Sequence, residues 1–206
     1  MSDPAGSERT PRLFVALNLP AELRATLHAA VRQAVAPLVE EAPRAVAWVP
    51  EPNLHVTVRF VGERPAALVD PLREALDLAA SAVHVHDLAI GGLGAFPNLR
   101  RPRVLWIGVA MNVALAALYQ KVDDACWRLA IGREARPFHP HVTIGRIRMG
   151  ASVPAGRLEE AVQALTTYRW TMPVETVDLM SSELASGGSR YARLHAAALS
   201  PASGGR

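Results

Sequence analysis

The tetrapeptide His55-Val56-Thr57-Val58 returns almost unchanged as His141-Val142-Thr143-Ile144, 86 residues later in the chain. Each copy lies in a run of β-branched, alternating residues, which predicts a strand at both places. Successive side chains of a strand point to opposite faces, so the His and the Thr of each copy share one face. The two apolar residues of each copy, together with Phe60 in the first, are expected on the other face. Two equivalent strands indicate a duplicated unit.

Strand and helix patterns alternate in a similar order in both halves of the chain. Hydrophobic periodicity predicts strands over 12–18, 46–49, 54–61, 83–90, 104–109, 141–147, 174–184 and 191–199, and helices within 20–38, 69–79, 115–129 and 158–165. The glycine-rich segment 91–97, which ends in Pro97, is expected to form a central loop.

This order predicts an α+β fold made of two similar lobes, each an antiparallel sheet with helices on the outside. A pseudo-two-fold axis would relate the lobes across a central cleft. We expect a single bilobal domain over residues 11–199, with intertwined lobes of roughly 11–98 and 99–199. Residues 1–10 and 200–206 are rich in Ser, Gly and Pro and are expected to be loose tails.

Composition narrows the class of protein. Half of the residues are apolar and a fifth are charged, which excludes a globally disordered chain. A single cysteine, Cys126, excludes a disulfide framework and a multi-cysteine zinc site. The longest uncharged stretch, 104–120, is shorter than the roughly 20 apolar residues of a membrane span. We therefore expect a cytoplasmic monomer that needs no membrane and no obligate protein partner.

Two His-Thr pairs on opposing walls of a cleft suit phosphoryl transfer. Hydrolysis of a 2′,3′-cyclic phosphate requires one group that takes a proton from water and one that gives a proton to the leaving sugar oxygen. Two imidazoles with ordinary pKa values of about 6.5 can fill both roles near neutral pH. The hydroxyls of Thr57 and Thr143 can donate hydrogen bonds to the phosphate oxygens. This chemistry requires no metal and no cofactor.

The sequence resembles the 2H phosphoesterases, and among them the bacterial and archaeal RNA 2′,3′-cyclic phosphodiesterases once called 2′-5′ RNA ligases. The matching stretches are residues 12–17 (RLFVAL), 53–62 (NLHVTVRFVG) and 136–146 (RPFHPHVTIGR), with a weaker match at Ser189-Arg190-Tyr191. The resemblance implies that His55 is the general acid, that His141 is the general base, and that the product is a 2′-phosphomonoester. It also implies that Thr57 and Thr143 hold the phosphate of an RNA end or a related nucleotide.

Three further residues are candidates for substrate binding. Strict alternation places Arg59 on the face of His55, where it can meet a phosphate. Arg146 belongs to the second motif but faces away from His141 by alternation, unless Gly145 permits a bulge or the strand ends there. Phe96 in the expected central loop can stack on a base. Next to it, Arg100, Arg101 and Arg103 can follow an RNA backbone, or they can be ordinary surface cations.

Other interpretations stay open from the sequence alone. The substrate can be a small cyclic nucleotide or a 2′,5′-linked oligonucleotide, or the chain can be a nucleotide- or RNA-binding module without turnover. The pairs His84/His86 and His139/His141 have metal-ligand spacing, although only one carboxylate lies near them in the sequence. Cys126 falls on an apolar helix stripe, which is typical of a core residue rather than a nucleophile.

Overall fold

The computed structural model describes residues 10–185 and 188–202. Most of the two expected tails, residues 1–9 and 203–206, lies outside this described part. Ser200 does not belong to a loose tail, because its backbone N–H donates to Val83 O over 2.9 Å and its carbonyl accepts from Val85 N over 2.8 Å. The C-terminal segment is therefore held in the fold as far as Ser200.

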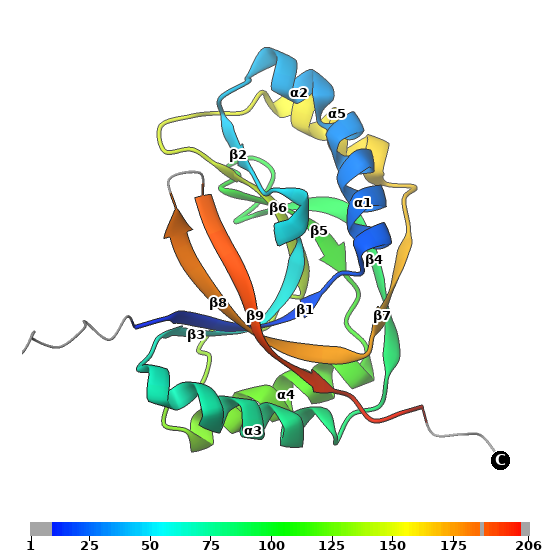
Figure 1. Cartoon of the computed structure of the whole chain (residues 1–206). Coiled ribbons are helices and arrows are strands. Elements are labelled where there is room, and N and C mark those ends of the chain that lie inside the picture. The colour runs from blue at the N-terminus through cyan, green and yellow to red at the C-terminus, as the bar shows by residue number, and fades with distance from the viewer. Residues whose placement is uncertain (1–9, 186–187, 203–206) are drawn as a thin grey trace, which may run out of the picture.

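In the described residues, helices surround a single nine-stranded sheet (Figure 1). The strands are β1 (Arg12–Asn18), β2 (Val46–Trp48), β3 (His55–Glu63), β4 (His86–Phe96), β5 (Val104–Val109), β6 (His141–Ile147), β7 (Trp170–Val174), β8 (Thr176–Ala185) and β9 (Gly188–Ala198). The helices are α1 (Ala21–Ala34), α2 (Ala36–Glu41), α3 (Val69–Ala80), α4 (Val113–Arg128) and α5 (Ala155–Leu165), with short 3₁₀ turns η1 (Glu51–Asn53) and η2 (Ala66–Leu68). None of these helices combines the length and apolarity needed to cross a bilayer.

The sheet consists of two halves. Strands β3, β1, β8 and β9 form one half and contact α3 and α4, which lie at the bottom of Figure 1. Strands β7, β4, β5 and β6, with β2 beside β6, form the other half and contact α1 and α5 at the upper right. Every pairing between strands is antiparallel. The predicted α+β class with outer helices is confirmed, and the two lobes share one continuous sheet.

The halves of the sheet do not coincide with residues 11–98 and 99–199. β4 precedes residue 98 in the chain but pairs with β5 and β7, and β8 follows residue 99 but pairs with β1. Likewise α1 packs against α5 on the half opposite to its neighbour β1. The lobes therefore exchange elements, and neither can form from one contiguous half of the chain.

The glycine-rich segment is a strand rather than a loop. β4 continues to Phe96 and pairs with β5 through Gly91 and Gly94. Gly92 has φ +75° and lies at a register shift, and a Cβ on Gly94 would collide with the indole ring of Trp106. The glycines thus accommodate a bulge and a close ring contact, two needs that local composition cannot distinguish from a turn.

The prediction also missed β7. This strand contains Pro173, which removes a backbone donor and weakens the strand pattern, but it lies at an edge of the sheet where proline is tolerated.

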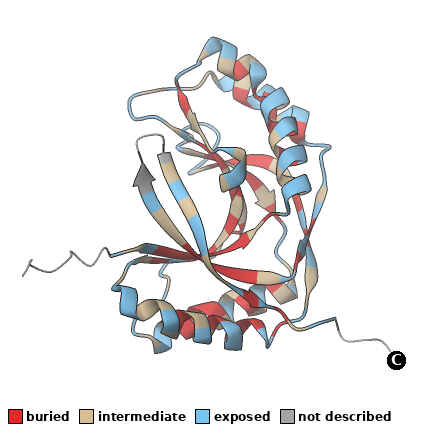
Figure 2. Cartoon of the chain, in the orientation of Figure 1, coloured by how far each residue is buried: buried red, intermediate tan, exposed pale blue. Residues whose placement is uncertain are grey.

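The core lies between the sheet and the helices. Figure 2 shows buried residues concentrated on the strands, with exposed residues on the outer faces of the helices. Leu13, Val15 and Leu17 of β1 are fully buried on the side that meets this core. Cys126 of α4 belongs to the same cluster, and burial raises the pKa of its thiol to about 11. The thiol is therefore protonated at neutral pH, as expected for a core residue.

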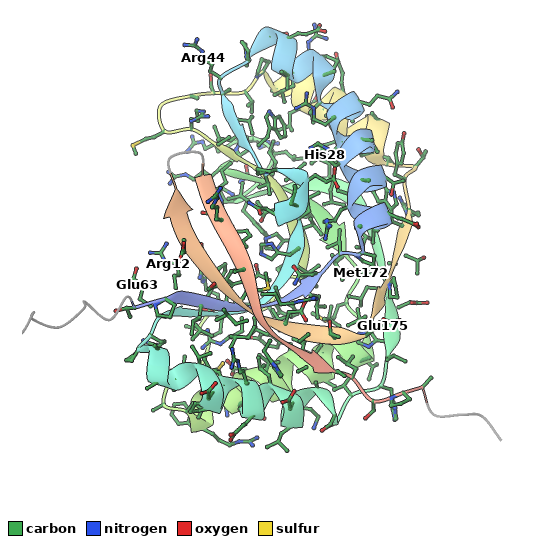
Figure 3. All side chains as sticks on the ribbon, viewed as in Figure 1. Arg12, His28, Arg44, Glu63, Met172 and Glu175 are labelled. Atoms are coloured by element: carbon green, nitrogen blue, oxygen red, sulfur yellow. The ribbon has the colours of Figure 1, made fainter. Side chains whose placement is uncertain are left out.

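The outer ends of β1 and β3 carry a surface ion pair. Arg12 and Glu63 are paired in the β1–β3 register, and their side chains meet with a guanidinium–carboxylate distance of 3.1 Å (Figure 3). Both side chains are more than half exposed, so this pair adds little to stability.

Two β-bulges occupy equivalent positions in β3 and β6. Along β1, Ala16 pairs with Thr57 and Val15 with Arg59, so Val58 is an extra residue. Along β5, Trp106 pairs with Thr143 and Leu105 with Gly145, so Ile144 is an extra residue. In both strands the bulge directly follows the His-x-Thr sequence and reverses the alternation of the side chains that come next. In β3 a second register shift follows at Val61.

The close packing at the β6 bulge can be tested by comparing two glycine-to-alanine substitutions, one at the bulge and one in α5. A Cβ on Gly145 would lie 2.7 Å from Val46 Cγ1 and 3.0 Å from Trp48 Cε3, so Gly145→Ala should lower the free energy of unfolding by about 1–3 kcal/mol. Gly156 in α5 has open space around it, so Gly156→Ala should be neutral or stabilising by up to about 1 kcal/mol. Urea denaturation of both variants measures the difference. Equal stabilities for the two variants would contradict the packing described for Gly145.

Candidate active site

The four residues of the repeated His-Thr pattern come together where the two halves of the sheet meet. β3 and β6 are antiparallel neighbours in register at Val56 and Val142, both fully buried. Because these two valines point into the core, the flanking His55, Thr57, His141 and Thr143 point to the opposite face. All four are partly exposed there. The antiparallel register sets each histidine next to the threonine of the other strand.

Both imidazoles are held in the same tautomer by the backbone. His55 Nδ1 donates to the carbonyl of Asn53 over 2.8 Å, and His141 Nδ1 donates to the carbonyl of His139 over 2.6 Å. A carbonyl can only accept, so Nδ1 carries a hydrogen in each ring and Nε2 is the basic atom when the ring is neutral. Nε2 of His55 then accepts from the Thr57 hydroxyl over 3.0 Å.

Burial and neighbouring charge lower the pKa of both histidines. For His55, burial has the largest effect, and positive charge on His141 and Arg146 lowers its pKa further. For His141, burial again has the largest effect, followed by charge on His139 and Arg146. The hydrogen bonds to Asn53 O and His139 O oppose these effects in part. Both rings are therefore predominantly neutral at neutral pH, and a bound anion would favour their protonation.

Aromatic rings surround each histidine. Tyr191 of β9 meets His55 edge-on with ring centroids 5.3 Å apart, and Phe14 of β1 lies 5.1 Å away on a tilted plane. Around His141, Phe96 lies at 5.0 Å in an edge contact and Trp106 at 6.2 Å. These rings restrict the orientation of the imidazoles and supply the burial that lowers their pKa.

Sequence reasoning identified only some of these four rings. Phe96 was expected to serve a bound base, and it lies against His141 at the end of β4. Phe14 and Tyr191 lie in the stretches that match the 2H family, but neither was assigned to the site. Trp106 was missed, although alternation along β5 from Gly108, the partner of His141, places it on the same face.

Arg146 reaches the site because of the bulge in β6. With Ile144 as the extra residue, Gly145 turns to the core and Arg146 turns to the face of His141 and Thr143. Its side chain is exposed, and its charge lowers the pKa of His55 as well as that of His141. The bulge that the sequence required for this orientation is present, with Ile144, the residue before Gly145, as the extra residue.

Arg59 does not reach the site, so the expectation of a phosphate contact for it is wrong. The bulge at Val58 turns Arg59 into the core, where its guanidinium lies 3.0 Å from Asp123 and 3.2 Å from Glu134 and also donates to the carbonyl of Gly132. Only 6% of the side chain is exposed. The network joins β3 to α4 and the segment that follows α4.

The same bulge brings Phe60 to the face expected for Arg59. Phe60 was expected in the core, but it is 55% exposed and its ring lies 6.5 Å from that of Phe14. The two bulges thus place Phe60 of β3 and Arg146 of β6 at equivalent positions. The site is pseudo-symmetric in its His-Thr pairs and asymmetric in charge.

The two pairs with metal-ligand spacing lie in different surroundings. His86 is the first residue of β4, and His84 lies two residues before it. His84 Nδ1 bonds to the carbonyl of Pro201 and His86 Nδ1 to that of His84. His139 serves the site through its carbonyl, as described above. Over residues 10–185 and 188–202, no three His, Cys, Asp or Glu side chains gather as a metal-binding group.

The sequence and the structure are similar to known phosphoesterases. Residues 22–106 and 107–191 each match the sequence model of the family described as LigT like phosphoesterase. The RNA 2′,3′-cyclic phosphodiesterase of Escherichia coli K12 is 30% identical over 188 residues, which cover 89% of this chain and 93% of that protein. The enzyme of the same name from Geobacillus stearothermophilus is 35% identical over 134 residues, but the chain spans only 43% of its length.

Solved structures agree with this relationship. The crystal structure of TT0787 from Thermus thermophilus has a TM-score of 0.76 and 28% identity, and covers 93% of this chain and 100% of its own. The crystal structure of E. coli LigT with 3′-AMP has a TM-score of 0.64 at 28% identity, over 92% of this chain and 98% of its own.

The buried ion network predicts a large effect on stability for one of two arginine substitutions. Arg59→Met leaves Asp123 buried without its main partner, so the free energy of unfolding should fall by about 3–5 kcal/mol. Arg133 also pairs with Asp123, over 2.9 Å, but its side chain is 47% exposed, so Arg133→Met should cost much less. Thermal and urea unfolding measure both. A small loss for Arg59→Met would refute a structural role for this arginine.

Proposed function

Because the chain belongs to the LigT like phosphoesterase family, we propose that it hydrolyses an RNA-terminal 2′,3′-cyclic phosphate to a 2′-phosphomonoester. The observation that carries the proposal is the matched orientation of the two histidines. Each Nδ1 is bound by the carbonyl two residues earlier, so both Nε2 atoms lie on one face of the sheet, that of His55 next to the Thr57 hydroxyl. A pair of equivalent proton-transfer atoms is what an in-line displacement at phosphorus requires.

The proposed reaction is a single displacement. Nε2 of neutral His141 takes a proton from a water molecule, whose oxygen attacks phosphorus on the side opposite the 3′ oxygen. The bond between phosphorus and the 3′ oxygen breaks, and Nε2–H of protonated His55 gives its proton to that oxygen. The 2′ ester bond remains intact. The assignment of acid and base to His55 and His141 follows the family resemblance, and the identity of the product isomer tests which sugar oxygen leaves.

Three donors stabilise the charge that develops on the non-bridging oxygens. The hydroxyls of Thr57 and Thr143 lie on the same face as the histidines, and Arg146 adds a positive charge from β6. Donors on this face lower the barrier by stabilising the charge as it develops, and protonation of His55 Nε2 releases the Thr57 hydroxyl from its bond to that ring. Arg146 also attracts the substrate phosphate, and Phe96 offers a ring for a base next to His141. Every step uses side chains of the chain itself, so the proposal includes no metal and no cofactor.

The first test is the identity of the product. Purified protein incubated in EDTA with a short RNA that ends in a 2′,3′-cyclic phosphate should release only the 2′-phosphate isomer, separated from the 3′ isomer by chromatography. His55→Ala and His141→Ala should each lower the rate by about 10²–10⁴-fold, because each removes one proton transfer. His28→Ala, a histidine on the outer helix α1 (Figure 3), should leave the rate unchanged.

Other outcomes of that assay point to other functions. A 3′-phosphate product would mean that the 2′ oxygen leaves, which keeps the two-histidine mechanism but reverses the orientation of the substrate in the site. Turnover of cyclic mononucleotides or 2′,5′-linked oligonucleotides without turnover of the RNA end would favour a different diesterase of the same superfamily. Binding without turnover of any of these compounds would favour a nucleotide-binding module. Near-normal turnover by either histidine variant would refute the two-histidine mechanism.

The lowered pKa values predict the pH dependence. The proposed reaction requires one proton on the pair, with His55 protonated and His141 neutral. Because the pKa of each ring lies below 6.5, the singly protonated free enzyme is most abundant below pH 6.5 and is lost as the pH rises. The profile of kcat/KM, which reports the free enzyme, should be bell-shaped with its maximum below pH 6.5. A maximum above about pH 7.5 would contradict the burial effect on these histidines.

A further inference from the structure

Exposed arginines gather beyond Arg146, at the end of β6 away from the histidines. They are Arg44 before β2, Arg100, Arg101 and Arg103 between β4 and β5, and Arg148 after β6. We propose that these five residues, called here the arginine ridge, bind the RNA strand that leads to the cyclic phosphate. The substrate would then be an RNA chain rather than a mononucleotide. This inference rests on the proposed function and extends it.

Backbone hydrogen bonds bring the three chain segments of the ridge together. The carbonyl of Arg103 accepts from Ile147 N over 2.9 Å, which sets the β4–β5 connection beside the end of β6. Arg148 N donates to the carbonyl of Ala45 over 2.8 Å, which sets Arg44 beside Arg148. Figure 1 shows β2, β6 and the β4–β5 connection together at the upper left of the molecule. Residues far apart in the sequence thus form one basic surface.

Arg100 and Arg101 are presented by a local turn. The side-chain oxygen of Asn98 accepts from the backbone N–H groups of both residues, over 3.0 Å each. This Asx-type turn holds the backbone of two consecutive arginines while their side chains stay exposed. The N–H of Arg103 donates to the carbonyl of Phe96 over 2.7 Å and closes the connection. The turn is therefore anchored next to the aromatic ring that contacts His141.

The charge of the ridge is uncompensated. Among the described residues, none of the five guanidinium groups lies within 4.0 Å of a carboxylate, whereas Arg73, Arg133 and Arg157 elsewhere on the surface each form ion pairs. The three segments that build the ridge, 42–50, 88–122 and 135–158, contain no Asp or Glu. Free positive charge of this density favours a polyanion and releases counterions when one binds.

The ridge continues the active site rather than forming a separate one. Arg146 pairs in register with Val104 of β5 and with Ala47 of β2, so it lies between the His-Thr residues and the ridge. At about 3.3 Å per residue, the end of β6 lies about 20 Å from His141. A stacked strand advances about 3.4 Å per nucleotide, so about six nucleotides would span this distance. A mononucleotide would occupy the His-Thr residues and leave the ridge empty.

The test compares substrates of different length. Oligoribonucleotides that end in a 2′,3′-cyclic phosphate should gain in kcat/KM with length up to about six nucleotides and then level off. The triple variant Arg100→Gln, Arg101→Gln, Arg103→Gln should lower kcat/KM for an octamer about tenfold, since three exposed ion pairs of ordinary strength combine to that factor. Hydrolysis of a cyclic mononucleotide should not change.

Salt dependence and a matched control variant show whether the lower kcat/KM results from lost phosphate contacts. The slope of log(kcat/KM) against log[salt] is negative, by about 0.7 per contact with a single strand, so loss of three phosphate contacts should make it less steep by about 2. The variant Arg32→Gln, Lys121→Gln, Arg128→Gln removes the same charge from α1 and α4 and should behave like the unaltered protein. Equal losses in both triple variants would overturn the ridge, because net charge alone would then explain the effect.

Failure of the ridge can be separated from failure of the proposed function. If the mononucleotide and the octamer have the same kcat/KM and the ridge variant leaves both unchanged, the ridge is overturned and the proposed function stands. If no cyclic phosphate is hydrolysed, the proposed function fails. In that case, fluorescence anisotropy with an octamer that ends in a 3′-hydroxyl still tests the ridge. About tenfold weaker binding by the ridge variant would support it, and unchanged binding would overturn it.

Discussion

The pairing of Val56 with Val142 is the contact on which the site depends. It joins the two halves of the sheet through β3 and β6, and it buries both valines. With these side chains in the core, alternation directs the flanking histidines and threonines to the other face. The proton-transfer groups therefore share one surface because two short apolar residues face the opposite way. Loss of this register by one residue would turn the His-Thr pairs into the core.

The β-bulges decide which charges reach that surface. Strict alternation after Thr57 would expose Arg59, and strict alternation after Thr143 would bury Arg146. The inserted residue in each strand reverses both outcomes, so Arg59 joins the buried network with Asp123 and Arg146 faces the histidines. A buried arginine is tolerated only when carboxylates compensate its charge. An exposed arginine without such partners stays available for an anionic substrate.

The packing of aromatic rings around the two histidines affects their protonation. Rings from β1, β9, β4 and β5 surround the two imidazoles, and this burial lowers the pKa of both. The backbone carbonyls that bind Nδ1 fix one tautomer at each site and partly oppose this effect. Arg146 beside these rings favours an arriving phosphate, which in turn favours protonation of the pair. The ridge beyond Arg146 extends the same positive field along β6.

The sequence by itself determined the α+β class, the main strands and helices, and the faces of His55, Thr57, His141 and Thr143. These follow from local periodicity, and the repeated motif marks the duplication. Only the tertiary structure decided which strands the intertwined lobes exchange, that β4 runs through its glycines, and that Arg59 is buried. The reason is that a bulge or a buried ion pair depends on residues distant in sequence, such as Asp123 opposite β3. The hydrophobic periodicity of a single strand or helix does not reveal such distant partners.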